Sequence, residues 1–178
     1  NERHAEADVD RTEDRATETT ARVAASTATR GQAPPSGGVA PRPVDLDRRL
    51  RAIAGKPPGS LVVHEIYRSI QGESTFAGLP CVFVRLTACH LRCGYCDTPH
   101  AFTQGEALPL EEVVARALED DTPLVELTGG EPLLQPEVHP LMTRLADAGR
   151  TVLLETSGAV DIAPVDPRVH VILDLKTP

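Results

Sequence analysis

The 178-residue chain contains no tryptophan, one methionine and only 3% aromatic residues. Its first 66 residues contain neither an aromatic residue nor a cysteine. Residues 1–58 also hold only seven large aliphatic side chains, together with six prolines. Such a segment cannot bury enough apolar surface to offset its chain entropy. We therefore predict a disordered, low-complexity tail over residues 1–58, in which residues 44–54 form a transient helix, and a compact domain over residues 59–178.

Three further absences narrow the function. No apolar run approaches the roughly 18 residues that a membrane helix needs. The N-terminal residues lack the apolar segment of a secretory signal, and their acidic content argues against a transit peptide. Residues 59–178 hold 8 Lys and Arg against 17 Asp and Glu, a net charge of −9 that disfavours binding to a nucleic-acid backbone. We expect a cytoplasmic protein with no membrane and no nucleic-acid partner.

The periodicity of residues 59–178 predicts an α/β fold. Apolar residues at helical spacing predict helices over residues 110–118 and 138–146. Short runs rich in β-branched residues predict strands, and these cover residues 61–67, 82–86, 124–127, 151–155 and 169–174. Strands that alternate with helices indicate a parallel sheet, in which binding residues gather where the strands end.

Three cysteines follow the strand at 82–86. Cys89, Cys93 and Cys96 have the spacing C-x3-C-x2-C within one predicted loop, too close together for a set of structural disulfides. Thiolates in such a group suit a soft metal or an iron–sulfur cluster, and three ligands leave the fourth iron of a 4Fe–4S cluster open. A closed zinc site formed with His90 or His100 is the alternative. Cys81, at a strand start, is expected to be a buried free thiol.

Polar or glycine-rich segments also follow the later strands. They read LTGGEP at 127–132, LETSG at 154–158 and LDLKTP at 173–178. Two glycines after a strand allow a sharp turn and a close approach of the backbone to a ligand. Lys176 is either a solvated surface charge or, given its position at a strand end, part of the same site.

The cysteine spacing and the GGEP segment resemble the radical S-adenosylmethionine (SAM) superfamily. The longer run EIYRSIQGESTFAGLPCVFVRLTACHLRCGYCDT resembles one of its families, the 7-carboxy-7-deazaguanine synthases. The order SIQGE, VFVRL, CDT, TGGEP, ETSG and DLK is that family's, over about 115 residues. The resemblance implies a partial (β/α) barrel of mostly parallel strands, and we expect it to be incomplete at its C-terminus, because the family continues beyond this point.

The resemblance also implies an activity. The family's enzymes are carbon–nitrogen lyases of queuosine and 7-deazaguanine biosynthesis. They convert 6-carboxy-5,6,7,8-tetrahydropterin to 7-carboxy-7-deazaguanine and release ammonia, using a 4Fe–4S cluster, SAM and Mg²⁺. The implied partners are the small pterin substrate, an electron donor such as flavodoxin or ferredoxin, and a second copy in a homodimer.

The matching positions carry the expected roles. Substrate contacts are implied for Ile70, Gln71, Gly72, Arg85 and Thr128. SAM contacts are implied for Tyr95, Cys96, Asp97, Gly130, Asp174, Leu175 and Lys176, with Glu155 and Ser157 as weaker candidates. The cluster ligands are Cys89, Cys93 and Cys96, and Thr98 is the implied Mg²⁺ ligand.

Two other functional classes share part of this pattern. Another radical SAM enzyme, such as a glycyl-radical-activating enzyme, shares the cysteines and GGEP but not SIQGE or CDT. A non-enzymatic zinc or electron-transfer module shares only the cysteines. One position departs from the synthase pattern, because Ser74 stands where the family usually has glycine after QGE.

Overall fold

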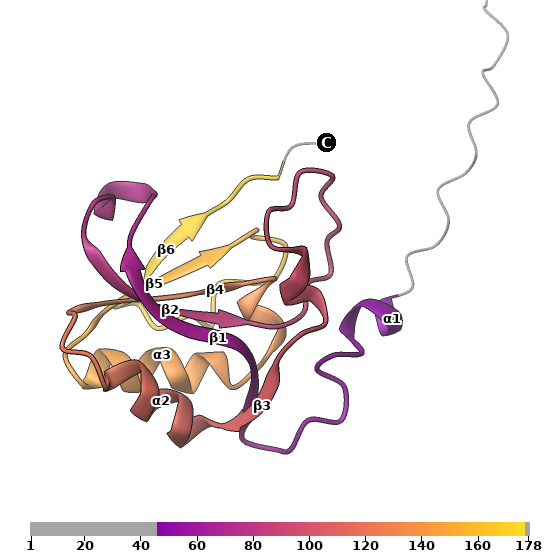
Figure 1. The fold of residues 1–178 in the computed structure, drawn as a ribbon, viewed down its shortest axis with the longest axis horizontal. Coiled ribbons are helices and arrows are strands. Elements are labelled where there is room, and N and C mark those ends of the chain that lie inside the picture. Colours follow the sequence, from indigo (N-terminus) through magenta and orange to yellow (C-terminus); the bar gives the residue numbers. More distant parts are fainter. Residues whose placement is uncertain (1–45, 177–178) are drawn as a thin grey trace, which may run out of the picture. The chain divides into compact units, whose positions relative to one another are not determined.

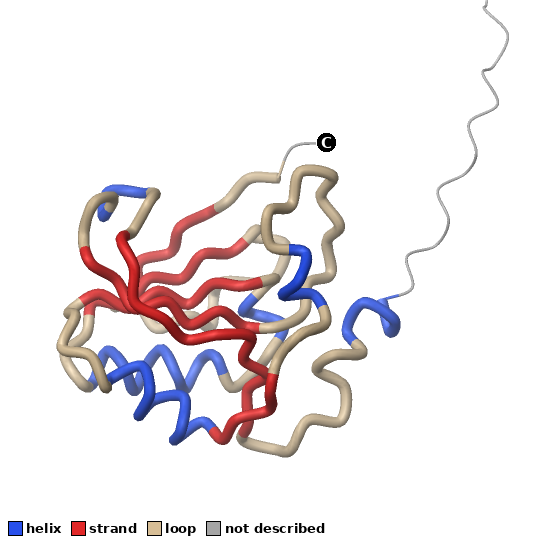
Figure 2. The backbone as a smooth tube through the Cα atoms, in the orientation of Figure 1, coloured by secondary structure: helices blue, strands red, loops and turns tan. Residues whose placement is uncertain are grey.

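The computed structural model describes residues 46–176, with side chains from residue 48 onward, and all of them belong to one unit, Pro43–Pro178. The predicted tail therefore lies mostly outside the described residues. A six-stranded sheet with the order β3-β1-β2-β4-β5-β6 forms the centre, and both longer helices cover one of its faces (Figures 1 and 2). The strands are β1 Ser60–Ile70, β2 Pro80–Leu86, β3 Glu106–Pro109, β4 Leu124–Gly129, β5 Thr151–Thr156 and β6 His170–Leu173. The helices are α1 Leu46–Leu50, α2 Leu110–Leu118 and α3 Val138–Asp147.

The sheet is mostly parallel and open, as expected of part of a (β/α) barrel. Strands β2, β4, β5 and β6 pair in parallel, with α2 and α3 in the connections before β4 and β5. Strand β1 is antiparallel to both β2 and β3. The sheet is therefore mixed, whereas the alternation of strands and helices in the sequence had indicated a parallel sheet. The reason is the connection between β1 and β2, which holds only a single turn of 3₁₀-helix at Ser74–Phe76, and a crossover to a parallel neighbour needs a longer segment.

Alternate residues of the strands form two unequal apolar layers. Val84, Leu127 and Leu154 point toward the helices and pack against Leu141 and Met142 of α3 in the main core. The opposite face has a smaller cluster: Cys81, Phe83, Leu124 and Leu153, with Tyr67, Phe76 and Ile172 against it. Cys81 is fully buried and free, as predicted. Toward the strand ends, this second face becomes polar and leaves room for a site.

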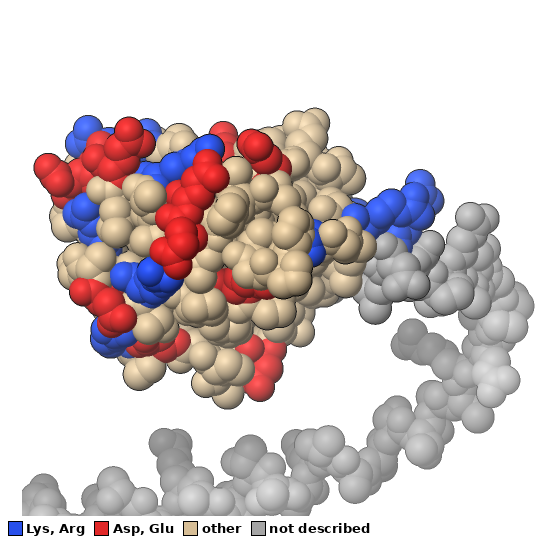
Figure 3. Space-filling model, turned by 90° about the horizontal axis from the view of Figure 1, so that it is seen from below, with Lys and Arg blue, Asp and Glu red and all other residues tan. Residues whose placement is uncertain are grey.

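The outer surface of the helical layer is charged but of mixed sign. Acidic and basic side chains lie next to one another on the face seen in Figure 3. Ion pairs such as Arg116–Glu112 and Arg168–Asp147 account for part of this pattern. No helix among residues 46–176 is long and apolar enough to cross a membrane.

The N-terminal segment before β1 contacts the rest of the unit. The helix expected over residues 44–54 is the five-residue α1, followed by turns. Arg49 donates a hydrogen bond to the backbone oxygen of His90, in the cysteine loop. Lys56 forms an ion pair with Glu137 at the start of α3, 2.5 Å apart. Contacts with the core therefore begin before residue 59.

A buried glutamine completes the hydrogen bonding of β1. Gln135 is 0% exposed, and its side-chain oxygen accepts a bond from the Val62 amide at 2.8 Å. Its side-chain nitrogen donates to the Val62 and Thr87 carbonyls at 3.0 and 3.1 Å. The amide side chain thus supplies backbone groups with the partners that buried polar groups require.

Replacing Gln135 should destabilise the fold much more than replacing an exposed glutamine. Gln135→Ala leaves buried backbone groups without a partner, and we expect a loss of about 2–4 kcal/mol in the free energy of unfolding. Gln104→Ala, at an exposed position, is the matched control and should change it by less than about 0.5 kcal/mol. Urea denaturation of both variants measures the difference, and equal effects would contradict the role assigned to Gln135.

Candidate active site

A cavity of about 420 Å³ lies at the C-terminal ends of the parallel strands. It is lined by residues of the loop after β1, the cysteine loop after β2, and the ends of β4, β5 and β6. It brings together all the predicted site residues except Ile70 and Leu175, whose side chains are 58% and 73% exposed. Sequence segments up to 105 positions apart, from Gln71 to Lys176, therefore converge on one site.

The cysteine loop begins with a backbone turn that few residues adopt. Ala88, directly after β2, has φ 80°, a left-handed conformation that is uncommon for any residue except glycine. Two backbone bonds hold it there, from its own amide to the Ala101 carbonyl and from the Glu131 amide to the Ala88 carbonyl, both 2.9 Å. The turn directs Cys89, Cys93 and Cys96 toward the cavity, which all three line.

The thiols suit an iron–sulfur cluster. The Leu91 amide donates to the Cys89 sulfur at 3.4 Å, a bond of the kind that tunes cluster sulfurs. Burial raises the pKa of the Cys89 thiol, so ligand binding must supply the driving force for its deprotonation. Among the described residues, the one group of His, Cys, Asp or Glu ligand atoms within 4.8 Å of one another does not include these cysteines.

The two histidines of the zinc alternative differ in their surroundings. The ring of His100 lies against the ring of His64, with 4.8 Å between centroids, rather than among the thiols. Both ring nitrogens of His90 are buried and have no hydrogen-bond partner. His90 is therefore the histidine that a zinc site would have to recruit.

The glycines of the TGGEP segment serve packing between two loops. A Cβ atom on Gly129 would lie 2.1 Å from the Leu86 carbonyl oxygen, and one on Gly130 would lie 2.1 Å from that of Ala88. These distances exclude any side chain without backbone movement. The sequence predicted that these glycines let the backbone approach a ligand. In the structure they let the end of β4 approach the backbone at the start of the cysteine loop.

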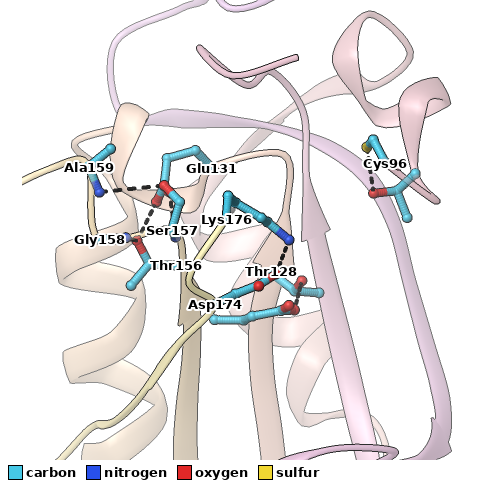
Figure 4. Close-up of polar contacts among 11 residues, drawn as sticks. Cys96, Thr128, Glu131, Thr156, Ser157, Gly158, Ala159, Asp174 and Lys176 are labelled. Carbon is cyan, nitrogen blue, oxygen red and sulfur yellow. Dashed lines mark hydrogen bonds and ion pairs between the residues drawn. The ribbon is translucent and has the colours of Figure 1, made fainter. Parts of the chain in front are cut away.

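Glu131 connects the same segment to β5. Its carboxylate is fully buried and accepts bonds from Thr156 Oγ1 at 2.8 Å and from the Ser157 amide and hydroxyl at 3.0 and 2.7 Å. Figure 4 shows this carboxylate beside Thr156 and Ser157, on the same side of the site as the Lys176–Asp174 ion pair. Since a buried carboxylate is costly unless its oxygens are bonded, these contacts fix the two loops relative to each other.

The loop after β1 is held by its own glutamine. The Gln71 amide and carbonyl bond to Leu79 and Gly78 at 2.8 and 2.7 Å, and its side chain accepts from the Glu73 amide. Its side-chain nitrogen donates to Glu126 on β4. Ser74, at the position where glycine is usual, has φ 61°, which explains why glycine suits this place.

A buried and a half-buried carboxyl group, Glu126 and Glu155, line the cavity from neighbouring strands. Glu126 is 4% exposed, and burial together with the charge of Glu155 raises its pKa to about 7. Burial also raises the pKa of Glu155, which accepts a 2.6 Å bond from the Thr128 hydroxyl. That bond uses the hydroxyl proton, so Thr128 presents lone pairs to a ligand.

Arg85 is held on the same face by β1. Its Nε donates to Glu65 Oε1 at 2.8 Å and a terminal nitrogen donates to the Tyr67 hydroxyl at 2.9 Å. Burial lowers its pKa, but these two partners outweigh that effect and raise it. The remaining N–H groups of this fixed guanidinium are available to an anionic ligand in the cavity.

The comparisons with known proteins agree with this geometry. Residues 83–175 match the model of the radical SAM superfamily, which is more than half of the chain. The chain belongs to this superfamily. The 7-carboxy-7-deazaguanine synthases of Chlorobaculum tepidum and Koribacter versatilis are 52% and 50% identical over 118 and 119 residues. These segments cover 66% and 65% of this chain and 54% and 52% of the two relatives.

A solved structure also resembles this radical SAM chain. QueE from Escherichia coli superposes with a TM-score of 0.56 and 26% identity, over 64% of this chain and 60% of that one. The chain spans about half the length of the curated relatives it matches. Superfamily membership implies a 4Fe–4S cluster and SAM, which the three thiols at the cavity fit.

Sequence reasoning missed several residues of this site. Glu126 belongs to none of the motifs, although strand alternation places it on the same face of β4 as Thr128. Glu73 also lines the cavity, and Glu65 and Tyr67 act through Arg85. The pairing of β1 with β2 explains the last two contacts. Glu65 is opposite Arg85, and Tyr67, opposite Phe83, lies two residues further along the same face of β1.

The raised pKa of Glu126 predicts a pH-dependent stability. Because the folded chain holds this proton up to about pH 7 and the unfolded chain releases it near pH 4.5, the contribution is fully present below pH 4.5 and is lost as pH rises through 7. Glu126→Gln should remove this dependence and stabilise the iron-free chain at pH 8 by about 3 kcal/mol.

Urea denaturation at pH 5 and pH 8 measures this effect. Glu112→Gln, which removes a half-exposed helix carboxylate, is the control and should keep the dependence of the unaltered chain. An identical pH dependence in Glu126→Gln and the unaltered chain would contradict the assignment.

Proposed function

We propose that the protein is a 7-carboxy-7-deazaguanine synthase, which converts 6-carboxy-5,6,7,8-tetrahydropterin to 7-carboxy-7-deazaguanine with release of ammonia. The observation that carries the proposal is the convergence of the family's separate motifs on one cavity. Gln71 and Gly72, Arg85, the cysteines, Thr128 and Lys176 come from different elements and line it together. The two curated relatives that are at least half identical to the chain bear this name.

The charges of the cavity suit the proposed ligands. Its lining has five acidic side chains and two basic ones, Arg85 and Lys176. A tetrahydropterin has several N–H donors and one carboxylate, and SAM has a sulfonium and an amino group. The carboxyl groups of Glu126, which is buried, and Glu155, which is half-buried, offer acceptors to such donors, and the guanidinium of Arg85 offers paired donors to the substrate carboxylate.

The same placement supports the proposed residue roles. Arg85, Thr128, Gln71 and Gly72 would hold the substrate, the last two mainly through their backbone. SAM would be held by residues of the cysteine loop and of the strand ends, namely Tyr95, Cys96, Asp97, Gly130, Asp174 and Lys176. Because Ile70 and Leu175 do not line the cavity, any contact they make with ligands is expected to involve mainly their backbone.

The cofactors complete the proposal. Cys89, Cys93 and Cys96 would hold the 4Fe–4S cluster, and the Thr98 hydroxyl, which lines the cavity, would bind Mg²⁺. When bound, the cluster and SAM supply a carbon-centred radical that removes a hydrogen atom from the substrate. An electron donor such as flavodoxin or ferredoxin, a homodimeric state and a cytoplasmic location belong to the same proposal.

A product assay tests the function directly. We expect purified full-length protein, reconstituted anaerobically with iron and sulfide, to form 7-carboxy-7-deazaguanine from the carboxytetrahydropterin, SAM, Mg²⁺ and a reductant, as detected by mass spectrometry. Cys93→Ala should abolish cluster absorption, SAM cleavage and product, whereas Cys81→Ala, at the buried cysteine outside the loop, should retain all three. Stoichiometric zinc without SAM binding would refute the proposal, and SAM cleavage without product would favour another radical SAM enzyme.

The role of Arg85 predicts a separation of the two ligands. Arg85→Ala should raise the KM for the pterin roughly 10- to 100-fold, because a charged hydrogen bond is lost, and leave the Kd for SAM within about twofold. Tyr67→Phe removes only one of the two groups that hold the guanidinium and should have a smaller effect in the same direction. An equal loss of affinity for both ligands would exclude the assigned role.

A further inference from the structure

A second group of metal-ligating side chains lies outside the cavity. It consists of His64 and Glu65 on β1 and His100 in the short 3₁₀-helix Pro99–Phe102. Their ligand atoms all lie within 4.8 Å of one another, and none of the three residues lines the cavity. No other group of this kind occurs in the part of the chain that the structure describes.

A β-bulge explains how two consecutive residues of one strand join the group. The register between β1 and β2 shifts after Val63, so that His64 and Glu65 together oppose the single step from Leu86 to Arg85. A bulge interrupts the strict alternation of side chains between the two faces of a sheet, and it redirects the extra residue. His64 and Glu65 can therefore approach the same point in space, which regular strand geometry would prevent.

The hydrogen bonds of the group leave its ligand atoms available. His64 Nδ1 lies 3.0 Å from the Gln104 carbonyl oxygen, which can only accept, so Nδ1 is the donor and Nε2 is the ring nitrogen left for a metal ion. Glu65 uses Oε1 for Arg85, and that bond leaves Oε2 for another partner. An imidazole held by a carbonyl and a carboxylate held by a second group are the usual surroundings of metal ligands.

We propose that His64, Glu65 and His100 form a binding site for a divalent transition metal of the zinc type, separate from the iron–sulfur cluster. Two imidazoles and one carboxylate are a known ligand set for zinc, with the remaining position open to water. Mg²⁺ prefers oxygen ligands and is therefore disfavoured here. Metal–ligand distances of about 2.0–2.2 Å require the three groups to draw closer by about 1.5 Å, which the exposed His100 side chain permits.

Metal titration of the cluster-loaded protein tests the proposal, because its cysteines are then engaged. We expect one Zn²⁺ per chain in equilibrium dialysis and visible d–d absorption with Co²⁺. His64→Ala and His100→Ala should each weaken binding at least about tenfold. His170→Ala, which removes an exposed histidine of β6, is the control and should leave binding unchanged. Retained cluster absorption in His100→Ala shows that its loop remains folded.

A second arm separates this site from the proposed function. In a variant with alanine at Cys89, Cys93 and Cys96, Zn²⁺ cannot bind the thiols, and one equivalent should still bind through the histidine group. The absence of bound Zn²⁺ in both preparations, or binding that is insensitive to His64→Ala and His100→Ala, would overturn the proposal. Neither readout requires turnover, so failure of the enzymatic assay would not affect it.

Discussion

The buried carboxylate of Glu131 fixes the relative positions of the segments that form the site. It receives bonds from Thr156 and Ser157 after β5, while its own amide donates to Ala88 after β2. A buried carboxyl group is costly unless donors surround it, so these bonds favour the one arrangement in which the segments supply them. The absence of room for a Cβ at Gly129 and Gly130 enforces the same arrangement by packing. Contacts with the end of β4 therefore position the start of the cysteine loop without any ligand.

The polar face that results concentrates acidic groups in a small volume. Glu126 and Glu155 lie on adjacent strands, and burial together with mutual repulsion raises the pKa of Glu126. Such a pair is unfavourable in the empty protein, and it becomes favourable when cationic or N–H-donating ligands neutralise it. The cavity therefore sacrifices stability for affinity, as binding sites commonly do. The opposite, helix-covered face of the sheet has no such constraint and forms the apolar core.

The sequence predicted the elements better than their directions. Periodicity located both long helices and the strands that flank them, since burial of one face imposes a regular spacing. It missed β3, a four-residue strand of mixed polarity at the sheet edge, and it could not show that β1 runs antiparallel. The sequence motifs predicted most of the residues that line the cavity, but Glu126 belongs to none of these motifs. Alternation along β4 places it on the same face as Thr128, so the assignment of Thr128 to the site could have identified Glu126 as well.

Arg85 connects the two sites that we infer. Its guanidinium faces the cavity, while its Nε bonds the same carboxylate, Glu65, that belongs to the histidine group. Both contacts follow from one register, in which Glu65 is directly opposite Arg85 beside the bulge at His64. A carboxylate shared between a guanidinium and a cation holds each less strongly than it would hold either alone. Metal at the histidine group would therefore weaken the hold of Glu65 on Arg85, because the bulge that assembles that group also sets the register that places Glu65 opposite Arg85.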